Sequence, residues 1–114
     1  MKPLVIQTEN LPQVCSDWLA ERCDLHICPA DSLRFKELLP LAEGIVIRTY
    51  TTIDAEMLQQ ATKLTVVGRA GVGVDNIDLG ACNEKGVTVV HTPDANSASV
   101  VEFVLSTVLA TIRN

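Results

Sequence analysis

The sequence predicts an α/β protein with an open, parallel, five-stranded sheet covered by helices on both faces. Five short apolar runs alternate with segments of helical periodicity, which is typical of consecutive βα units. Aromatic residues make up only 4% of the 114 residues and hydrophobic residues 47%, so the core must be built from aliphatic side chains. Right-handed crossovers leave few topologies for such a chain, and we predict the flavodoxin-like strand order 2-1-3-4-5.

Each predicted strand is a short apolar run that ends near turn residues. In chain order the five strands are Pro3–Thr8, Leu25–Cys28, Gly44–Arg48, Leu64–Val67 and Val87–Val90. At 114 residues the chain has room for one domain, with a core large enough to fold without disulfides or metal. We therefore treat residues 1–114 as a single lobe.

The predicted helices follow the strands one by one. The first, Leu11–Arg22, carries Val14, Trp18 and Leu19 on one stripe. The second spans Ser32–Leu39. The third has Asp54 or Thr52 as its cap and turns inward the side chains of Ala55, Leu58 and Ala61. The fourth, Ile77–Lys85, stops at Gly86, and the long fifth helix covers Ser97–Arg113.

The stretch Gly68–Asn76, GRAGVGVDN, is the most informative one for function. Three glycines within six residues allow a tight turn that exposes backbone N–H groups, which suits a carboxylate or a phosphate. Arg69 lies within this stretch and Arg48 ends the neighbouring strand. Ligands of such sheets bind at the carboxyl ends of the strands. Two guanidinium groups there predict a site for a small dianion, although a packing turn with arginines in solvent is an open alternative.

The same stretch does not fit a nucleotide-binding loop. Gly71 and Gly73 satisfy the first half of the dinucleotide pattern, but Asn76 occupies the third glycine position. The acidic residue expected about 20 residues later is missing, and His91 stands near that place. No Gly-Lys-Ser/Thr follows either, which excludes a Walker loop. We expect an anion-binding loop but no nicotinamide site in this chain.

The segment His91–Glu102 supplies further polar candidates. Ser99 and Glu102 have the spacing of a capping box that opens the last helix, so we interpret Glu102 as structural. Asn96 could orient a substrate or could cap the helix, and the sequence leaves both open. His91 has no partner at a spacing that would indicate a catalytic triad.

Charge and cysteine content exclude several classes of protein. The net charge of −5 argues against a nucleic-acid or acidic-membrane surface, and no apolar run is long enough to span a membrane. His26 lies near two of the cysteines, but their pattern does not indicate a metal site. The cysteines lack framework spacing and predict free thiols in a reducing cytoplasm: Cys15, Cys23, Cys28 and Cys82.

The last helix has apolar residues nearly all round, from Ala98 to Ile112. One sheet covers only one stripe of a helix. Leaving several such side chains in water costs about 1.5–3 kcal/mol each, so something else should pack there. We predict that a second lobe, a second copy of the chain, or both cover this helix. In a homodimer through the helix, the two copies could exchange their last helices.

From Gly44 to Arg113 the sequence resembles the D-2-hydroxyacid dehydrogenase family, and within it the branch that acts on 3-phosphoglycerate. The segments that carry the likeness are GIVIR, KLTVVGRAGVGVDNIDLGAC and EKGVTVVHTPDANSASVVEF; the first 43 residues match only in topology. In that family a flavodoxin-like substrate lobe is joined by a long helix to a Rossmann lobe, which holds NAD and the catalytic Arg, Glu and His.

The resemblance implies substrate-binding roles for six residues. Five of them, at the end of the third strand and in the glycine stretch, would contact the phosphorylated acid and its carboxylate: Arg48, Thr49, Arg69, Val72 and Gly73. The sixth, Asn96, would lie near the reacting centre. Residues 97–114 correspond to the helix that crosses to the Rossmann lobe. We therefore expect a chain with no catalytic, cofactor-binding or metal-binding residues of its own, and without activity alone.

Two other functions compete with this interpretation. A stand-alone structural module would use the last helix only for dimerisation. A phosphoacceptor or FMN carrier would need an acidic pocket or a hydroxyl- and glycine-rich first loop, and the chain offers Thr8, Glu9 and Arg48 instead. Binding of a small anionic hydroxy acid remains the favoured function.

Overall fold

The computed structural model describes residues 2–71, 73–91 and 98–113 and contains the predicted parallel sheet. The five strands are β1 (Leu4–Gln7), β2 (Asp24–Ile27), β3 (Gly44–Ile47), β4 (Val66–Arg69) and β5 (Thr88–His91). All neighbouring strands pair in parallel, in the order β2-β1-β3-β4-β5. The predicted flavodoxin-like order is thus confirmed.

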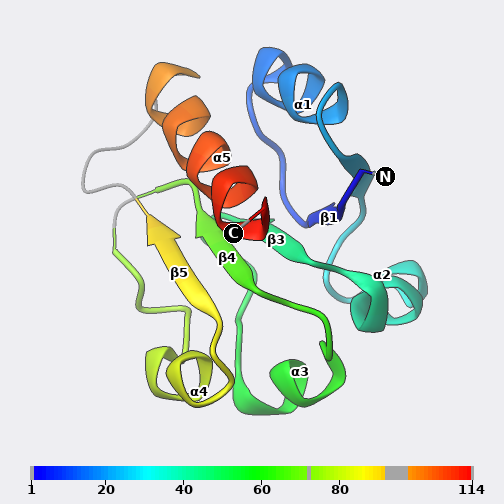
Figure 1. Ribbon diagram of the computed structural model, residues 1–114, viewed down its shortest axis with the longest axis vertical. Helices are drawn as coiled ribbons and strands as arrows, with labels where there is room; N and C mark the ends of the chain where they lie inside the picture. Colours follow the sequence, from blue (N-terminus) through cyan, green and yellow to red (C-terminus); the bar gives the residue numbers. More distant parts are fainter. Residues whose placement is uncertain (1, 72, 92–97, 114) are drawn as a thin grey trace.

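Helices cover both faces of this sheet (Figure 1). They are α1 (Gln13–Ala20), α2 (Leu33–Leu38), the 3-10 turn η1 (Leu39–Leu41), α3 (Ala55–Gln60), α4 (Leu79–Glu84) and α5 (Ala98–Arg113). Successive strand residues point to opposite faces. Val5 therefore packs with Leu19 of α1 and Leu105 of α5, whereas Ile6 belongs to the cluster under α2, α3 and α4.

The fourth strand lies two residues later than predicted, so Gly68 and Arg69 belong to β4 and not to a loop. Gly68 is paired with Val46 and Val90, and Arg69 with Ile47. The physical reason is packing. A Cβ atom at Gly68 would lie 2.6 Å from Cγ2 of Val108, so the glycine lets α5 lie directly on the strand.

In the first and third helices, one residue of each predicted inward stripe is exposed and the others are buried or half-buried. In α1 the buried positions are Cys15, Ser16 and Leu19, while Val14 is 55% exposed. Of the residues predicted to face inward from the third helix, Leu58 and Ala61 are buried and Ala55 is exposed. Both exposed residues lie in the first turn of a short helix, Val14 in Gln13–Ala20 and Ala55 in Ala55–Gln60.

Carboxylate caps open the third and fourth helices. Of the two predicted caps for α3, Asp54 is the one used, since its Oδ1 accepts from the backbone N of Met57 at 2.9 Å. The fourth helix starts later than predicted. Ile77 forms a bridge with Ile53, and Asp78 then caps α4 through the backbone N of Ala81 at 2.9 Å.

The sheet and α1 cover more of α5 than the sequence suggested. The buried side chains face β3, β4 and α1: Val101, Val104, Leu105, Val108 and Leu109. Over residues 101–113, the exposed apolar side chains are Phe103, at 64%, and Ala110. Ser99 lies inside the first turn of α5, so it is not the cap residue of the predicted capping box. No helix in the described part is both long and apolar enough to cross a membrane.

Candidate functional site

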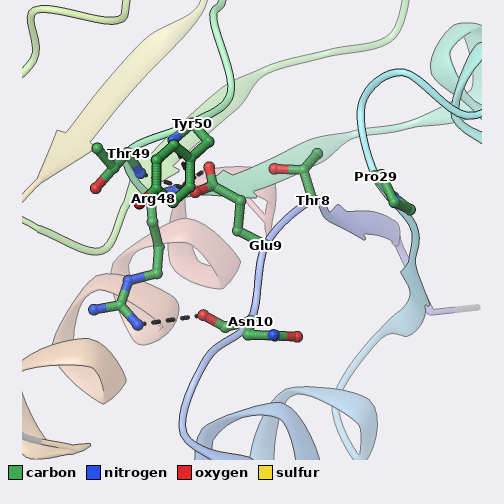
Figure 2. Close-up of a pocket in the computed structure, with 7 residues that line it drawn as sticks. All are labelled: Thr8, Glu9, Asn10, Pro29, Arg48, Thr49 and Tyr50. Carbon is green, nitrogen blue, oxygen red and sulfur yellow. Dashed lines mark hydrogen bonds between the residues drawn. The ribbon is translucent and has the colours of Figure 1, made fainter.

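The carboxyl ends of the first three strands in the sheet order open into a cavity of about 540 Å³. Seven residues line it (Figure 2), and they come from the segments that follow β1, β2 and β3: Thr8, Glu9, Asn10, Pro29, Arg48, Thr49 and Tyr50. This edge of a parallel sheet is where ligands of such folds bind. Of the predicted substrate residues, Arg48 and Thr49 line this cavity, whereas no described residue of the glycine stretch does.

Arg48 brings a cationic side chain to this cavity. Its Nη1 donates to the backbone carbonyl of Asn10 at 3.2 Å, and Figure 2 shows the side chain extended from the β3 end toward that segment. Thr49 lines the same cavity, and Tyr50 is 91% exposed beside it. A half-buried guanidinium at a sheet edge can form charge-assisted bonds to a carboxylate or a phosphate.

Glu9 fastens the turn that carries Arg48. One carboxylate oxygen, Oε2, accepts from the backbone N of Arg48 at 2.8 Å and of Thr51 at 3.1 Å. The other, Oε1, accepts from the backbone N of Thr49 at 3.0 Å and of Tyr50 at 2.9 Å. Burial raises the pKa of Glu9, but hydrogen bonds from the backbone of Tyr50 and Arg48 and from the backbone and side chain of Thr51 outweigh burial and lower this pKa below its usual value.

Arg69 is the last residue of β4, within the glycine stretch, and is only 5% exposed. Its Nε donates to the carbonyl of Arg48 at 3.1 Å and its Nη1 to the carbonyl of Gly73 at 3.0 Å. A Cβ atom at Gly71 would lie 3.4 Å from Nη1, and Gly73 has a φ of +83°. The glycines thus let the backbone turn closely over a buried guanidinium, whose charge favours anions at this edge.

Asn76 ties the glycine stretch to the turn after β3. Its Nδ2 donates to the carbonyls of Arg48 at 2.8 Å and Thr51 at 2.7 Å. Its Oδ1 is buried and, in the described part of the chain, has no hydrogen-bond partner. The two segments flanking the predicted dianion site are therefore joined by side-chain to backbone bonds.

The structure places four of the six predicted substrate residues at this edge. Arg48 and Thr49 line the cavity, and Arg69 and Gly73 lie in the adjoining glycine stretch. Val72 and Asn96 lie outside the described residues. No substrate-binding role was predicted for Glu9 from the sequence, although Thr8–Asn10 directly follows the first strand and so belongs to the segments where ligands of such sheets bind.

The remaining polar candidates stand apart from this site. His26 on β2 contacts Asp24 at 3.2 Å and Arg34 at 2.8 Å, and the described residues contain no cluster of three or more metal-ligating side chains. All four cysteines are buried free thiols. Burial raises the pKa of Cys23 to about 11, which keeps this thiol protonated and unreactive.

The sequence of the chain matches a known protein family. Residues 5–113 match the family described as D-isomer specific 2-hydroxyacid dehydrogenase, catalytic domain. The chain belongs to the D-2-hydroxyacid dehydrogenase family. The resemblance inferred from the sequence is therefore confirmed, and it also extends over most of the first 43 residues, for which we expected a likeness in topology alone.

Curated relatives include D-3-phosphoglycerate dehydrogenases of several organisms. The chain is 49% identical over 73 residues to that of Methanocaldococcus jannaschii, which covers 64% of the chain and 14% of the relative. It is 36% identical over 112 residues to that of Mycobacterium leprae, covering 97% of the chain and 21% of the relative. The chain thus spans only about a fifth or less of the length of these relatives.

Solved structures of the family share the fold. A 2-hydroxyacid dehydrogenase from Ketogulonicigenium vulgare superposes with a TM-score of 0.73 at 26% identity, over 82% of this chain and 30% of that one. A D-lactate dehydrogenase from Aquifex aeolicus, solved with NAD and lactic acid, gives 0.65 at 25% identity, over 79% of this chain and 28% of that one. The sheet described above is thus a unit that recurs within larger dehydrogenases of this family.

Proposed function

We propose that residues 1–114 are the substrate-binding lobe of an NAD-dependent D-2-hydroxyacid dehydrogenase of the 3-phosphoglycerate type. The observation that carries this proposal is the pair of arginines at one sheet edge. Arg48 lines the cavity and Arg69 lies within the adjoining glycine stretch, in a chain whose net charge is −5. Positive charge concentrated against the overall charge suits a small acid with two anionic groups.

In this function the lobe captures and orients the acid. Arg48 would take one anionic group through charge-assisted hydrogen bonds, and the buried charge of Arg69 would favour the second group over the glycine stretch. Thr49 would add a hydroxyl at the cavity wall. We also propose that Val72 and Asn96 contact the acid, on the basis of the family resemblance alone. Holding the acid in one orientation is the contribution of this lobe to hydride transfer.

We propose that the described residues do not hold NAD, and two observations support this. The carbonyl of Gly73 is turned to Arg69, and the N-terminus of α4, which follows the glycine stretch, carries the carboxylate of Asp78 where a pyrophosphate would bind. We therefore propose that NAD, which supplies the hydride acceptor in the family, is held by a second lobe reached through residues 97–114. Alone, this chain should produce no NADH from 3-phosphoglycerate, and an NADH signal from pure protein would overturn that expectation.

The test of binding is an amide NMR titration with D-3-phosphoglycerate. We expect shifts that cluster at residues 48–51 and in the glycine stretch, and weaker binding of D-glycerate, which lacks the phosphate. Arg48→Gln should weaken binding by about tenfold or more, since a charge-assisted bond contributes about 1.5–3 kcal/mol. The matched control is Arg34→Gln on α2, away from the cavity. Shifts that are absent, or that spread evenly over the surface, would contradict the proposal.

A second candidate function is a structural module that dimerises through α5. It is favoured by the exposed side chain of Phe103. We propose a homodimer through this helix in either function. Phe103→Asp should then yield a monomer in analytical ultracentrifugation, while Leu33→Asp, at an exposed leucine on α2, should not. Dimerisation without any acid binding would favour the structural module.

The buried free thiols also suit a reducing cytoplasm.

A further inference from the structure

We propose that Glu9 is a positioning residue: its carboxylate holds the Arg48–Thr51 turn, and with it the Arg48 side chain, in the shape that receives the acid. This inference rests on the proposed function of the cavity. When the acid binds, the Glu9 carboxylate would keep its hydrogen bonds to the turn. Glu9 would thereby fix the position of the Arg48 side chain that contacts the substrate.

The geometry of the turn is that of an anion-binding nest which the chain fills by itself. Four successive backbone N–H groups, from Arg48 to Thr51, converge on one carboxylate at 2.8–3.1 Å, two on each oxygen. Such a concavity of N–H groups ordinarily attracts a bound anion. Since Glu9 occupies it, the substrate cannot use these donors and must be recognised by the side chains of the turn, chiefly Arg48.

The same short segment also contacts the Arg48 side chain. Asn10, the neighbour of Glu9, accepts from Nη1 of Arg48 through its backbone carbonyl at 3.2 Å. Residues 9 and 10 therefore hold both the backbone N and the guanidinium of one arginine (Figure 2). Loss of the Glu9 carboxylate would free the turn and would let the guanidinium move with it.

Glu9 is in turn held from behind by buried polar side chains. Gln7 is 2% exposed, and its Nε2 donates to the carbonyl of Glu9 at 3.0 Å. Ser16 of α1, also buried, donates through Oγ to Oε1 of Gln7 at 3.0 Å. Thr8 and Thr51 share a hydroxyl bond of 2.6 Å beside them. Burying polar groups is costly unless all are paired, so this network favours one fixed position for the carboxylate.

The experiment compares Glu9→Ala with wild type by amide NMR and by affinity for D-3-phosphoglycerate, with and without formate. Glu84→Ala, at an exposed glutamate on α4, is the matched control. We expect the variant to lose affinity by about tenfold or more, equivalent to about 1.4 kcal/mol, and the amide signals of residues 48–51 to move. Formate should refill the nest, return those signals toward their wild-type positions and restore affinity. In wild type, formate should not tighten binding.

A purely structural role would give a different pattern. A folded Glu9→Ala variant that binds the acid as tightly as wild type would overturn the inference, as would failure of formate to return the amide signals. If Glu9→Ala does not fold, Glu9→Gln decides by the same readouts, because it keeps the size and loses the charge. If wild type itself binds no acid, the proposed function fails, and the formate response of the turn still decides whether Glu9 positions it.

Discussion

Replacement of Gly68 by alanine tests how closely α5 lies on the sheet. The added Cβ would lie 2.6 Å from Cγ2 of Val108 and 3.1 Å from Cγ1 of Val104, and both valines are fully buried. Because these contacts are on one helix, relief requires α5 to move as a body. Overpacking costs about 1–3 kcal/mol, and the lower entropy of the unfolded chain returns about 0.4–1 kcal/mol. We expect a net loss of about 1–2 kcal/mol, seen as a fall in Tm of about 5 °C or more.

The assay is urea denaturation combined with a double-mutant cycle. Val108→Ala removes the clashing methyl group, so the pair Gly68→Ala with Val108→Ala should lose at least about 0.5 kcal/mol less than the two single changes summed. The control is Gly80→Ala in α4, where the nearest atom lies 3.6 Å away and no loss is expected. A neutral Gly68→Ala, or an additive cycle, would refute the packing explanation.

Three further changes probe the site and its supports. Gly73→Ala should cost about 1–2 kcal/mol in urea denaturation because Gly73 has a φ of +83°; an unchanged midpoint would contradict this. The pKa of Glu9 is lowered in the folded state, so its stabilisation is present above the ordinary pKa of a glutamate and is lost as pH falls through the folded value. Glu9→Gln should therefore flatten the acid side of the stability curve, and a curve parallel to that of wild type would count against it. Asp78→Ala should cost about 1 kcal/mol in thermal denaturation through loss of the α4 cap, with Asp78→Asn much milder; equal effects would exclude capping as the cause.

The glycine stretch illustrates how far residue patterns carry a functional prediction. Its composition indicated a turn and an anion-friendly edge, and the fold places Arg48 and Arg69 at neighbouring strand ends as expected. The separate tasks of its residues were not visible. Gly68 serves the packing of α5, Arg69 binds two backbone carbonyls, and Gly73 makes the turn. The type of a residue shows which interactions it can make. Its actual partners lie on distant segments that only folding brings close to it.

The sequence by itself determined the strand order, the alternation of strands and helices and the edge where the polar residues gather, because these follow from periodicity and from the handedness of crossovers. Only the tertiary structure decided that Glu9 fills the turn after β3 and that Asn76 joins this turn to the glycine stretch. These contacts link residues 39 and 28 positions apart. Hydrogen bonds at such separations depend on the exact register of neighbouring strands, which local patterns do not encode.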